Sequence, residues 1–456
     1  MTDGIRGEAF VYSGYDIDAS AAVASMHYQV GGHEFTEWVR IPGMTQWNSH
    51  VVGRAVEILY LLAGVSYYKT HAPSTIRLGD TTTTSREREI LRQYYLEGLG
   101  EFAARNNLSL DGLEIVGPET ATPRATLPES PNATDPTNPD NHSNRRPLIP
   151  FGGGIDSIVT VEHVRRRFPD ASLFVVNRPD DRFEAIEASA AVTGLPILRA
   201  ERAIDPKLFE SQRRGWLDGH VPVTGIVSAI AVLAAVLGGR TDVVMSNEAS
   251  ASVPTRSVNG REVNHQYSKS ADFEVLFREL LAEHIGPIPA YFSWLRDMSE
   301  LWVAREFSQL SAYWDSFRSC NRSFRLDRRQ RLDHWCGECD KCCFIDLILS
   351  PFMAAADLRA IFRGNEPLDN PDLADSFRRL VGTYPGQKPW ECVGDELECR
   401  AAVTLAVRRP DRAANAVLRQ LTREAPPVDE ETIESLLNPK TNSYRPDGYA
   451  LDSVLG

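Results

Sequence analysis

Positive charge is in short supply in this sequence of 456 residues, which has 49 lysines and arginines against 62 aspartates and glutamates. Proteins that bind nucleic acid use Lys and Arg to replace the counterions of the phosphates, so a net charge of −13 argues against a nucleic-acid partner. One local run is the exception, and it is typical of either a salt-bridged surface or an anion-binding patch: Arg318, Arg322, Arg325, Arg328, Arg329 and Arg331.

Long hydrophobic runs are scarce as well. The strongest candidate for a membrane span, residues 221–239, contains Pro222 and Gly225 and is barely long enough to cross a bilayer. Predicted strands and acidic residues on both sides favour a helix buried against a parallel sheet. The first fifteen residues are polar and acidic, unlike a signal peptide. We therefore expect a cytoplasmic protein without membrane contact, whose seven cysteines are reduced.

The most informative segment is Phe-Gly-Gly-Gly-Ile-Asp-Ser at 151–157, which follows a predicted strand at 148–151 and precedes a predicted helix at 158–168. Glycines let the backbone approach a phosphate, and the first N–H groups of the helix point at it. Asp156 fits beside phosphates if it caps the helix, braces the turn or meets them through Mg²⁺. The candidate nucleotide-binding residues here are Gly152, Gly153, Gly154, Asp156 and Ser157.

Two familiar glycine loops are absent. A Walker loop needs a Lys after its glycines, and a dinucleotide fingerprint needs a third glycine where Ser157 stands. What remains resembles the S-G-G-x-D-S loop of the PP-loop ATP pyrophosphatases, with Gly152 in place of the leading Ser. In that superfamily the loop holds the pyrophosphate part of ATP while a substrate oxygen attacks the α-phosphorus. The alternative is a glycine-rich turn in an unrelated α/β protein.

The chain divides into four predicted regions. Strands alternate with helices from residue 148 to about 315, which predicts an α/β fold with a doubly wound parallel sheet. Before it lie an N-terminal α+β domain, 1–117, and a flexible linker, 118–147, rich in Pro, Thr, Asn, Asp and Ser. Residues 316–456 carry a cysteine cluster and read as largely helical after Pro351. Within the first region we expect strands near 10–12, 23–30, 34–41 and 113–116, a hairpin turn at Gly31-Gly32, and helices at 51–68 and 85–106.

Two polar segments follow predicted strands in the α/β region. Asn247 and Glu248 come directly after the strand 241–246, and the carboxyl ends of parallel strands are where α/β folds bind ligands. They are candidates for contact with the nucleotide or its metal, although an ordinary helix-capping turn is equally consistent. The segment 264–270 gathers acid–base groups, among them His265 and Lys269, which are candidates for proton transfer.

Cysteines are few, but four of the seven fall within 336–343. Cys336, Cys339 and Cys342 have C-x2-C-x2-C spacing, and Cys320 can supply a fourth thiolate, which predicts a tetrahedral structural zinc site. Iron–sulfur ligation uses similar spacing, and chance clustering is the remaining alternative.

Three further cysteines lie outside that set. Cys343 is either a core thiol or a nucleophile, and Cys392 and Cys399 are predicted to lie on a helix as buried apolar residues.

Taken together, the motifs resemble the UDP-N-acetylmuramoyl-L-alanyl-L-glutamate epimerase family. The resemblance rests on segments 151–157, 246–252, 264–270, 336–342 and 389–394. The cysteine pattern is also similar to the zinc site of the deazaguanine nitrile synthases, which are PP-loop enzymes.

The family resemblance implies an ATP- and Mg²⁺-dependent reaction that yields AMP and diphosphate. It converts the L-Glu end of UDP-MurNAc-L-Ala-L-Glu to D-Glu for peptidoglycan synthesis. It assigns no catalytic base, so by residue type the candidates are His265, Lys269, Glu248 and Cys343. The alternatives are another adenylating PP-loop enzyme, such as an amide or nitrile synthase acting on a small carboxylate, and a nucleotide-binding regulator without turnover.

Overall fold

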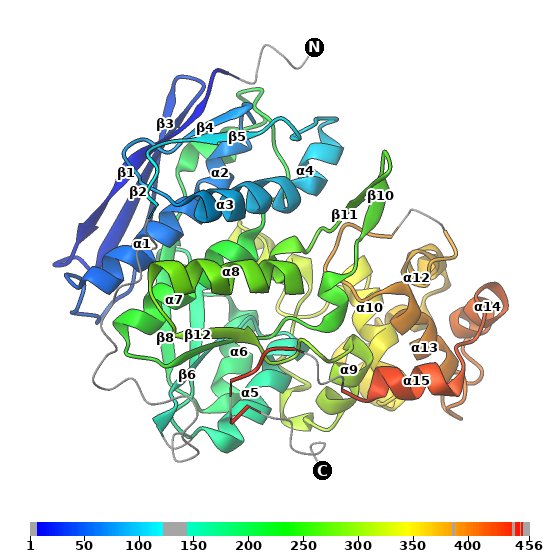
Figure 1. Ribbon diagram of the computed structural model, residues 1–456. Helices are drawn as coiled ribbons and strands as arrows, with labels where there is room; N and C mark the ends of the chain where they lie inside the picture. Colours follow the sequence, from blue (N-terminus) through cyan, green and yellow to red (C-terminus); the bar gives the residue numbers. More distant parts are fainter. Residues whose placement is uncertain (1–6, 122–143, 385–387, 440–442, 447, 450–456) are drawn as a thin grey trace.

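A ten-stranded sheet forms the centre of the protein, with strand order β12-β9-β6-β7-β8-β3-β2-β1-β4-β5 (Figure 1). The computed structural model describes residues 7–121, 144–384, 388–439, 443–446 and 448–449. Five neighbouring strands pair in parallel: β6 (Pro147–Pro150), β7 (Ser172–Asn177), β8 (Ile197–Ala203), β9 (Asp242–Met245) and β12 (Ala290–Ser293). The expectation of an α/β fold with a mostly parallel sheet is confirmed.

Apolar residues on successive positions of these strands enter two different cores. In β7, Leu173 and Val175 belong to one core and Phe174 to the other, as the alternation of side chains along a strand requires. The Leu173 core contains residues of α5 (Ile155–Arg167), α6 (Glu184–Thr193) and α9 (Glu300–Ser308). The Phe174 core contains residues of α1 (His50–Ala63), α7 (Val223–Leu237) and α8 (Ala271–His284). Helices therefore cover both faces of the sheet.

The N-terminal strands continue this same sheet. β1 (Phe10–Asp18), β2 (Val23–Val30) and β3 (His33–Arg40) form an antiparallel meander, and the predicted Gly31-Gly32 turn joins the last two with positive φ at both glycines. β3 then pairs antiparallel with β8, through Trp38 and Ala203. On the other side of the meander β1 pairs in parallel with β4 (Thr75–Arg77), which pairs in parallel with β5 (Glu114–Val116). Residues 7–117 thus share a sheet with the region that begins at β6.

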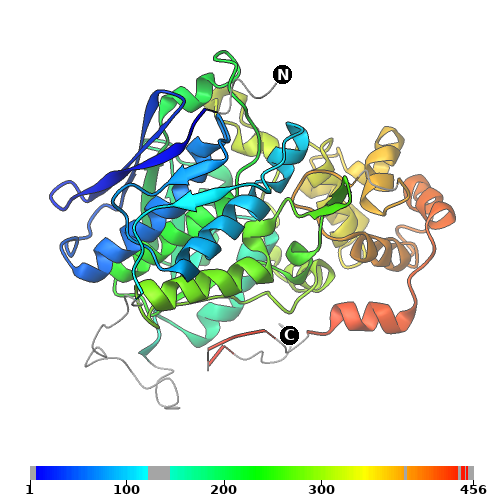
Figure 2. The same cartoon turned by 45° about the horizontal axis from the view of Figure 1, so that its top comes forward.

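Short helices complete the N-terminal region, and a lobe of helices follows the sheet. The N-terminal set is α2 (Val65–Tyr68), α3 (Ser85–Gly98) and α4 (Gly100–Arg105). A hairpin of β10 (Arg256–Val258) and β11 (Arg261–Val263) projects between α4 and the C-terminal lobe (Figure 1). The lobe, to the right in Figures 1 and 2, holds α10 (Asp340–Leu349), α11 (Ala355–Ile361), α12 (Ala374–Leu380), α13 (Glu396–Ala406), α14 (Ala416–Glu424) and α15 (Glu430–Leu437).

The segment expected to be a flexible linker, 118–147, is described only at its ends. Thr120 donates its backbone N–H to the Thr83 carbonyl at 3.1 Å, and β6 begins at Pro147. Residues 122–143 lie outside the described part of the chain.

One helical stretch in the described residues, His50–Tyr68, is long and apolar enough to cross a bilayer by length and composition. Within the protein, 83% of its apolar window is buried, as expected for a core helix. The segment that the sequence singled out, 221–239, contains the shorter helix α7. Its residues pack in the core that contains Phe174.

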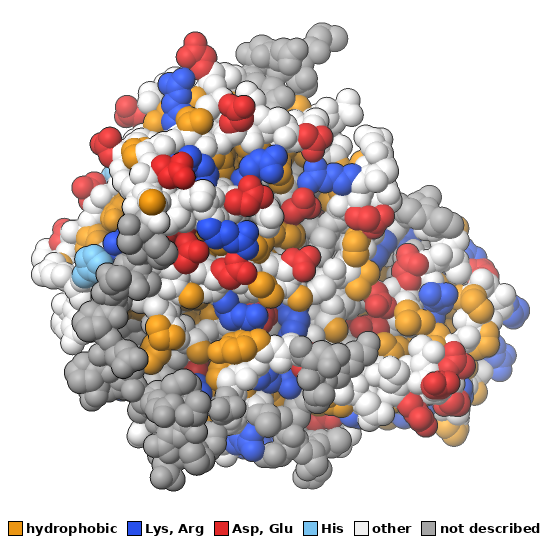
Figure 3. Space-filling model, in the orientation of Figure 1, with side chains coloured by type: hydrophobic (Ala, Val, Ile, Leu, Met, Phe, Trp, Pro, Cys, Tyr) orange, Lys and Arg blue, Asp and Glu red, His pale blue; other side chains and the backbone are white. Residues whose placement is uncertain are grey.

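Most of the arginine run forms a salt-bridged surface. Arg328 and Arg331 both bind Asp181, at 2.9 and 2.7 Å, and Arg322 binds Glu338 at 2.9 Å. Acidic and basic side chains are likewise interspersed over the face of the molecule drawn in Figure 3. Arg318 differs from the rest of the run because it is only 7% exposed.

Candidate active site

The glycine turn lies where the strand order changes direction. β7 and β8 follow β6 on one side, whereas β9 and β12 lie on the other, so the carboxyl ends of β6 and β9 flank the switch point at which α/β sheets bind ligands. Pro150 has no N–H to donate, which weakens strand pairing at that position. β6 does pair with β7 as far as Pro150, but its pairing with β9 ends at Leu148. The two strands therefore separate just before the turn.

The backbone of the turn is open to a ligand. Gly153 has φ +76°, and a Cβ there would lie 2.6 Å from the Ala185 carbonyl oxygen, so a side chain is excluded. A Cβ on Gly152 would meet nothing within 4 Å. Gly154 begins α5 without a side-chain cap, which leaves the first N–H groups of the helix facing the turn. This geometry leaves room for an anion at these N–H groups, and the anion cradle stays a prediction.

Arg318 lies against the same turn. Its backbone N–H donates to the Gly153 carbonyl at 3.1 Å, and its buried Nη1 has no hydrogen-bond partner. A Cβ on Gly154 would lie 3.6 Å from the Cβ of Ser319. Burial lowers the pKa of Arg318, and the carboxylates of Asp333 and Glu184 oppose that shift. A buried guanidinium nitrogen without a partner beside a glycine turn suits a phosphate oxygen.

Three carboxylates meet beside the turn. One oxygen each of Asp156, Glu248 and Glu300 lies within 4.8 Å of the others, and the two glutamates are 3% and 4% exposed. Burial, followed by the negative charge of Glu248, raises the pKa of Asp156 to about 7. Burial also raises the pKa of Glu300 well above its usual value. We call Asp156, Glu248 and Glu300 the carboxylate trio.

The trio has the chemistry of a cation site. Asp156 Oδ1 and Glu300 Oε2 are buried without hydrogen-bond partners, and none of the three side chains forms a salt bridge within the described residues. Asp156 does not cap α5, since that helix has no side-chain cap. Converging carboxylate oxygens with free lone pairs are ligands for a hard divalent cation such as Mg²⁺.

The other two residues predicted at this edge, Ser157 and Asn247, form hydrogen bonds within the protein. Ser157 donates its hydroxyl to the Gly154 carbonyl at 3.0 Å. Asn247 is held through its backbone, because its N–H donates to Ser293 Oγ at 2.6 Å and its carbonyl accepts from that hydroxyl at 2.7 Å. The first contact lies within the first turn of α5, and the second joins the ends of β9 and β12.

Two lysines approach the trio from different elements. Lys341, on α10, donates to the Cys392 carbonyl, and Lys269 donates to Gln266 Oε1 at 3.2 Å. Positive charge on both lysines opposes the upward shift in the pKa of Asp156. For Lys269, burial lowers the pKa, but the charges of Cys392, Glu248 and Asp156 outweigh burial and raise it.

Cys392 corrects one expectation from the sequence. It lies before α13 rather than on a helix, and it is half-buried among charged groups rather than in the apolar core. Burial by itself would raise the pKa of its thiol. The charge of Lys269, a hydrogen bond from His265 and the charge of Lys341 outweigh burial and bring the pKa to about 6. By contrast, Cys399 is on α13 and fully buried, as predicted.

His265 links Cys392 to a residue of the N-terminal region. Its Nδ1 pairs with the carboxylate of Glu101 on α4, which also binds Arg105 at 2.6 Å. Burial lowers the pKa of His265, but hydrogen bonds to Cys392 and Glu101 raise it to about 9. The neighbouring ring of His220 lies 4.2 Å away between centroids, and burial lowers its pKa to about 4.

The four cysteines predicted to bind metal come together. Their sulfur atoms all lie within 4.8 Å of one another, with Cys336 and Cys339 each 3.5 Å from Cys342, and the cluster could hold a metal ion. Cys343 lies in the core behind this cluster, where burial raises its pKa. The structure therefore does not bring Cys343 together with His265, Lys269 and Glu248.

The sequence missed Glu300, Glu101, Lys341 and Cys392. Glu300 is an acid in the first turn of a helix, which usually only complements the helix dipole. Glu101 is 164 residues from His265, so no local pattern connects them. Lys341 lies between Cys339 and Cys342, and the cysteine motif is the one signal that could have drawn attention to it.

A glycine turn and a carboxylate trio lie at the switch point of the α/β sheet, and a thiol–imidazole pair lies on the same side of the protein as the trio's lysines. Comparison with protein families shows the family to which the chain belongs. The chain belongs to the MurL family, because the MurL N-terminal domain matches residues 1–294 and the MurL C-terminal domain matches residues 316–436. The resemblance seen in the sequence is confirmed.

Relatives with curated names agree with this assignment. Proteins of Salinispora tropica, Xanthomonas oryzae pv. oryzae and Micromonospora sp. are 38%, 37% and 38% identical to the chain. The matches cover 98%, 90% and 92% of this chain and 95%, 88% and 92% of the relatives. Each relative is named UDP-N-acetyl-alpha-D-muramoyl-L-alanyl-L-glutamate epimerase.

Proposed function

We propose that this chain is a cytoplasmic ATP-dependent epimerase of peptidoglycan precursor synthesis. It inverts the α-carbon of the terminal L-Glu in UDP-MurNAc-L-Ala-L-Glu and releases AMP and diphosphate. The names of the relatives support the substrate and the overall change. The observation that carries the ATP dependence is the meeting of the open glycine turn with the carboxylate trio at the sheet's switch point.

ATP would bind with its phosphates at the turn. The N–H groups at the start of α5 and the guanidinium of Arg318 supply donors for phosphate oxygens. The trio fits Mg²⁺, since two of its buried oxygens have no other partner. When bound, the metal supplies positive charge that neutralises the phosphates. These groups stabilise the charge that develops as the substrate carboxylate attacks the α-phosphorus.

Adenylation explains why the reaction consumes ATP, because it makes the α-proton of the glutamate more acidic. While the glutamate carboxylate is charged, its α-proton is very weakly acidic. Transfer of AMP to that carboxylate removes the charge and produces an acyl adenylate, whose α-carbon loses a proton more readily. Reprotonation on the opposite face inverts the centre, and water then releases AMP.

The proposal is tested by following two products at once. Protein is incubated with Mg²⁺, ATP and UDP-MurNAc-L-Ala-L-Glu in deuterated water. We expect release of diphosphate only when the UDP-dipeptide is present, together with deuterium at the glutamate α-carbon. Diphosphate release without deuterium uptake would reject epimerisation. A product that incorporates ammonia would identify an amide or nitrile synthase, and tight ATP binding without AMP under any condition would identify a regulator.

We further propose that the cysteine cluster holds a structural Zn²⁺. Tetrahedral zinc with sulfur bonds of about 2.3 Å places its sulfurs about 3.8 Å apart, and two of the observed pairs are 3.5 Å apart. The ion would fix the start of α10, and with it Lys341, between two of the ligands.

Cys339→Ser tests this zinc site. We expect loss of bound zinc and of folding free energy, measured by metal analysis and urea unfolding. Cys399→Ala, which removes a buried thiol outside the cluster, should lose less stability and keep the metal. Equal stability and equal metal content in Cys339→Ser and the parent protein would refute the zinc site.

A further inference from the structure

We infer that Cys392 is the base that removes the substrate's α-proton, and that His265 and Glu101 hold its thiol in the ionised form. This inference rests on the proposed function and names a residue for the proton-transfer step of that reaction. Cys392 is far in the sequence from the nucleotide motif at 151–157. Only the fold makes it a candidate.

The geometry is a chain of three side chains from distant elements. The carboxylate of Glu101, from α4, pairs with the imidazole of His265, from the segment between β11 and α8. The imidazole in turn interacts with the thiol of Cys392, from the segment before α13. A base oriented by a third group and bonded to a thiol is the arrangement that activates cysteines in enzymes.

Three basic side chains favour the thiolate of Cys392 and outweigh the nearby carboxylate of Asp156. Lys269 hydrogen-bonds the thiol, His265 donates to it, and Lys341 binds the carbonyl of the same residue. The pKa of about 6 for Cys392 and of about 9 for His265 make the pair a thiolate and an imidazolium at neutral pH. His220 has a lowered pKa and is neutral at neutral pH, so His265 is the charged imidazole of the two.

The thiolate also lies on the nucleotide side of the site. Its negative charge contributes to the raised pKa of Asp156 in the first turn of α5. Lys341 donates its Nζ to the Cys392 carbonyl, and its positive charge lowers the pKa of both Asp156 and Glu300. An acyl adenylate with its phosphate at the glycine turn would therefore place its α-carbon in the part of the site that contains Cys392.

The other candidates for the base are less well suited. His265 and Lys269 are both held in their protonated forms by the groups around them. Glu248 belongs to the carboxylate trio, and Cys343 lies in the core away from the site. Among these candidates, Cys392 is the residue that is deprotonated near neutral pH and lies outside the carboxylate trio.

The step balances as a simple proton transfer. The Cα–H bond breaks, the proton forms an S–H bond with Cys392, and the electron pair passes to the acyl carbonyl oxygen as an enolate. Solvent supplies a proton to the opposite face of the α-carbon. The thiol returns its proton to solvent, which restores the thiolate, and water releases AMP from the acyl group.

The first test separates the two half-reactions. Cys392→Ala should keep UDP-dipeptide-dependent exchange of labelled diphosphate into ATP to within about tenfold, yet lose deuterium uptake by about 1000-fold. Cys399→Ala, a matched buried-thiol control, should keep both. Deuterium uptake in Cys392→Ala within tenfold of the parent would overturn the inference. Absence of diphosphate exchange in the parent enzyme would instead overturn the proposed function.

A second test uses the native protein and does not depend on the folding of the variant. The rate of alkylation of Cys392 by iodoacetamide, followed by mass spectrometry, should rise with a midpoint near pH 6. In Glu101→Gln the midpoint should move toward the ordinary thiol value of about 8.5. An ordinary midpoint in the parent would overturn the inference. A covalent substrate adduct on Cys392 would overturn it as well. So would a metal ion lost in His220→Asn, because ligand atoms of Glu101, His220 and His265 lie within 4.8 Å of one another and could bind one.

Discussion

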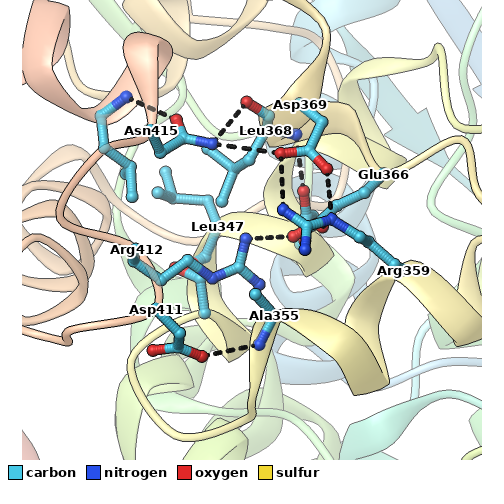
Figure 4. Close-up of polar contacts among 12 residues, drawn as sticks. Leu347, Ala355, Arg359, Glu366, Leu368, Asp369, Asp411, Arg412 and Asn415 are labelled. Carbon is cyan, nitrogen blue, oxygen red and sulfur yellow. Dashed lines mark hydrogen bonds and ion pairs between the residues drawn. The ribbon is translucent and has the colours of Figure 1, made fainter.

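Two places in this protein bury a group of carboxylates, and they differ in what accompanies them. At the switch point, the trio of Asp156, Glu248 and Glu300 has no salt bridge among the described residues. In the C-terminal lobe, Asp346 and Glu366 are fully buried, but Glu366 pairs with Arg412, which is only 1% exposed (Figure 4). Arg359 adds a second guanidinium 3.4 Å from Glu366.

The difference distinguishes a binding site from a structural cluster. In both places burial raises the pKa of carboxyl groups, among them Asp156, Glu300 and Asp346. In the lobe the chain supplies the counter-charge itself, and the Asp346 carboxylate also accepts the Leu368 N–H at 2.8 Å. Both places contain buried carboxylate oxygens without hydrogen-bond partners, among them Asp156 Oδ1 and Asp346 Oδ1. At the switch point no salt bridge within the described residues offsets this burial, which is costly unless a ligand does so. We therefore propose that the first group binds a ligand and that the second stabilises the fold.

The largest effect is expected for Asp156→Asn. This change keeps the shape of the side chain but removes the charge that would hold Mg²⁺ at the phosphates, so AMP formation should fall by about 1000-fold or more. Unfolding by urea should show no loss of stability, because a buried like charge is removed. Asp346→Asn is the matched control, expected to alter stability and not turnover. Equal turnover in Asp156→Asn and the parent would contradict a ligand-binding role for the trio, which would then not differ from the lobe carboxylates.

Arg412→Met should produce the opposite pattern. Removing the partner of a buried carboxylate costs about 3–5 kcal/mol in other proteins, and we expect a comparable loss of unfolding free energy with normal turnover in the protein that remains folded. Without Arg412, the folded-state pKa of Glu366 should rise further above its unfolded value. A raised pKa stabilises the fold at low pH, and that stabilisation is lost as pH rises through the folded-state pKa. The deficit should therefore be larger at about pH 8 than at about pH 5, and a deficit independent of pH would contradict this account.

Local patterns predicted the parts of the site that lie within one motif. The glycines, Asp156 and Glu248 follow strands whose carboxyl ends must meet in a parallel sheet, so their neighbourhood could be foreseen. The cysteine spacing likewise brought four sulfurs together. These inferences succeed because the chain between the residues is short or the sheet geometry is fixed.

The rest of the site depends on contacts that no local pattern encodes. Glu101 reaches His265 because β3 pairs with β8 and carries the N-terminal region to the edge of the central sheet. Cys392 reads as part of an apolar helical segment, and only the lysines that approach from other elements reveal its charged surroundings. β4 and β12, at three and four residues, are too short to stand out from the surrounding sequence.

Glu300→Gln tests whether the carboxylate trio binds Mg²⁺, through the stabilisation that the cation gives. Mg²⁺ at about 100 times its dissociation constant should stabilise the parent by about 2.7 kcal/mol, seen as a higher unfolding midpoint. The variant should lose most of that gain, because one ligand has been removed. Without Mg²⁺ the variant should be at least as stable as the parent, since glutamine resembles the neutral form that burial already favours for Glu300. A Mg²⁺-dependent shift of the same size in both proteins would place the cation elsewhere.

The smallest effect is expected for Arg318→Met, which tests whether the glycine turn uses a buried guanidinium as well as its backbone. Loss of one charged phosphate contact is worth about 1.5–3 kcal/mol, so KM for ATP should rise by about tenfold or more while KM for the UDP-dipeptide stays unchanged. The methionine keeps most of the buried volume and removes an Nη1 that has no partner in the protein, so stability should hold. Arg328→Met, from the salt-bridged part of the same run, should leave both constants unchanged because its charge is already paired with Asp181. Equal KM values for ATP in the two variants would mean that the whole arginine run is a structural surface, with the phosphates held by the backbone of the turn and the trio's cation alone.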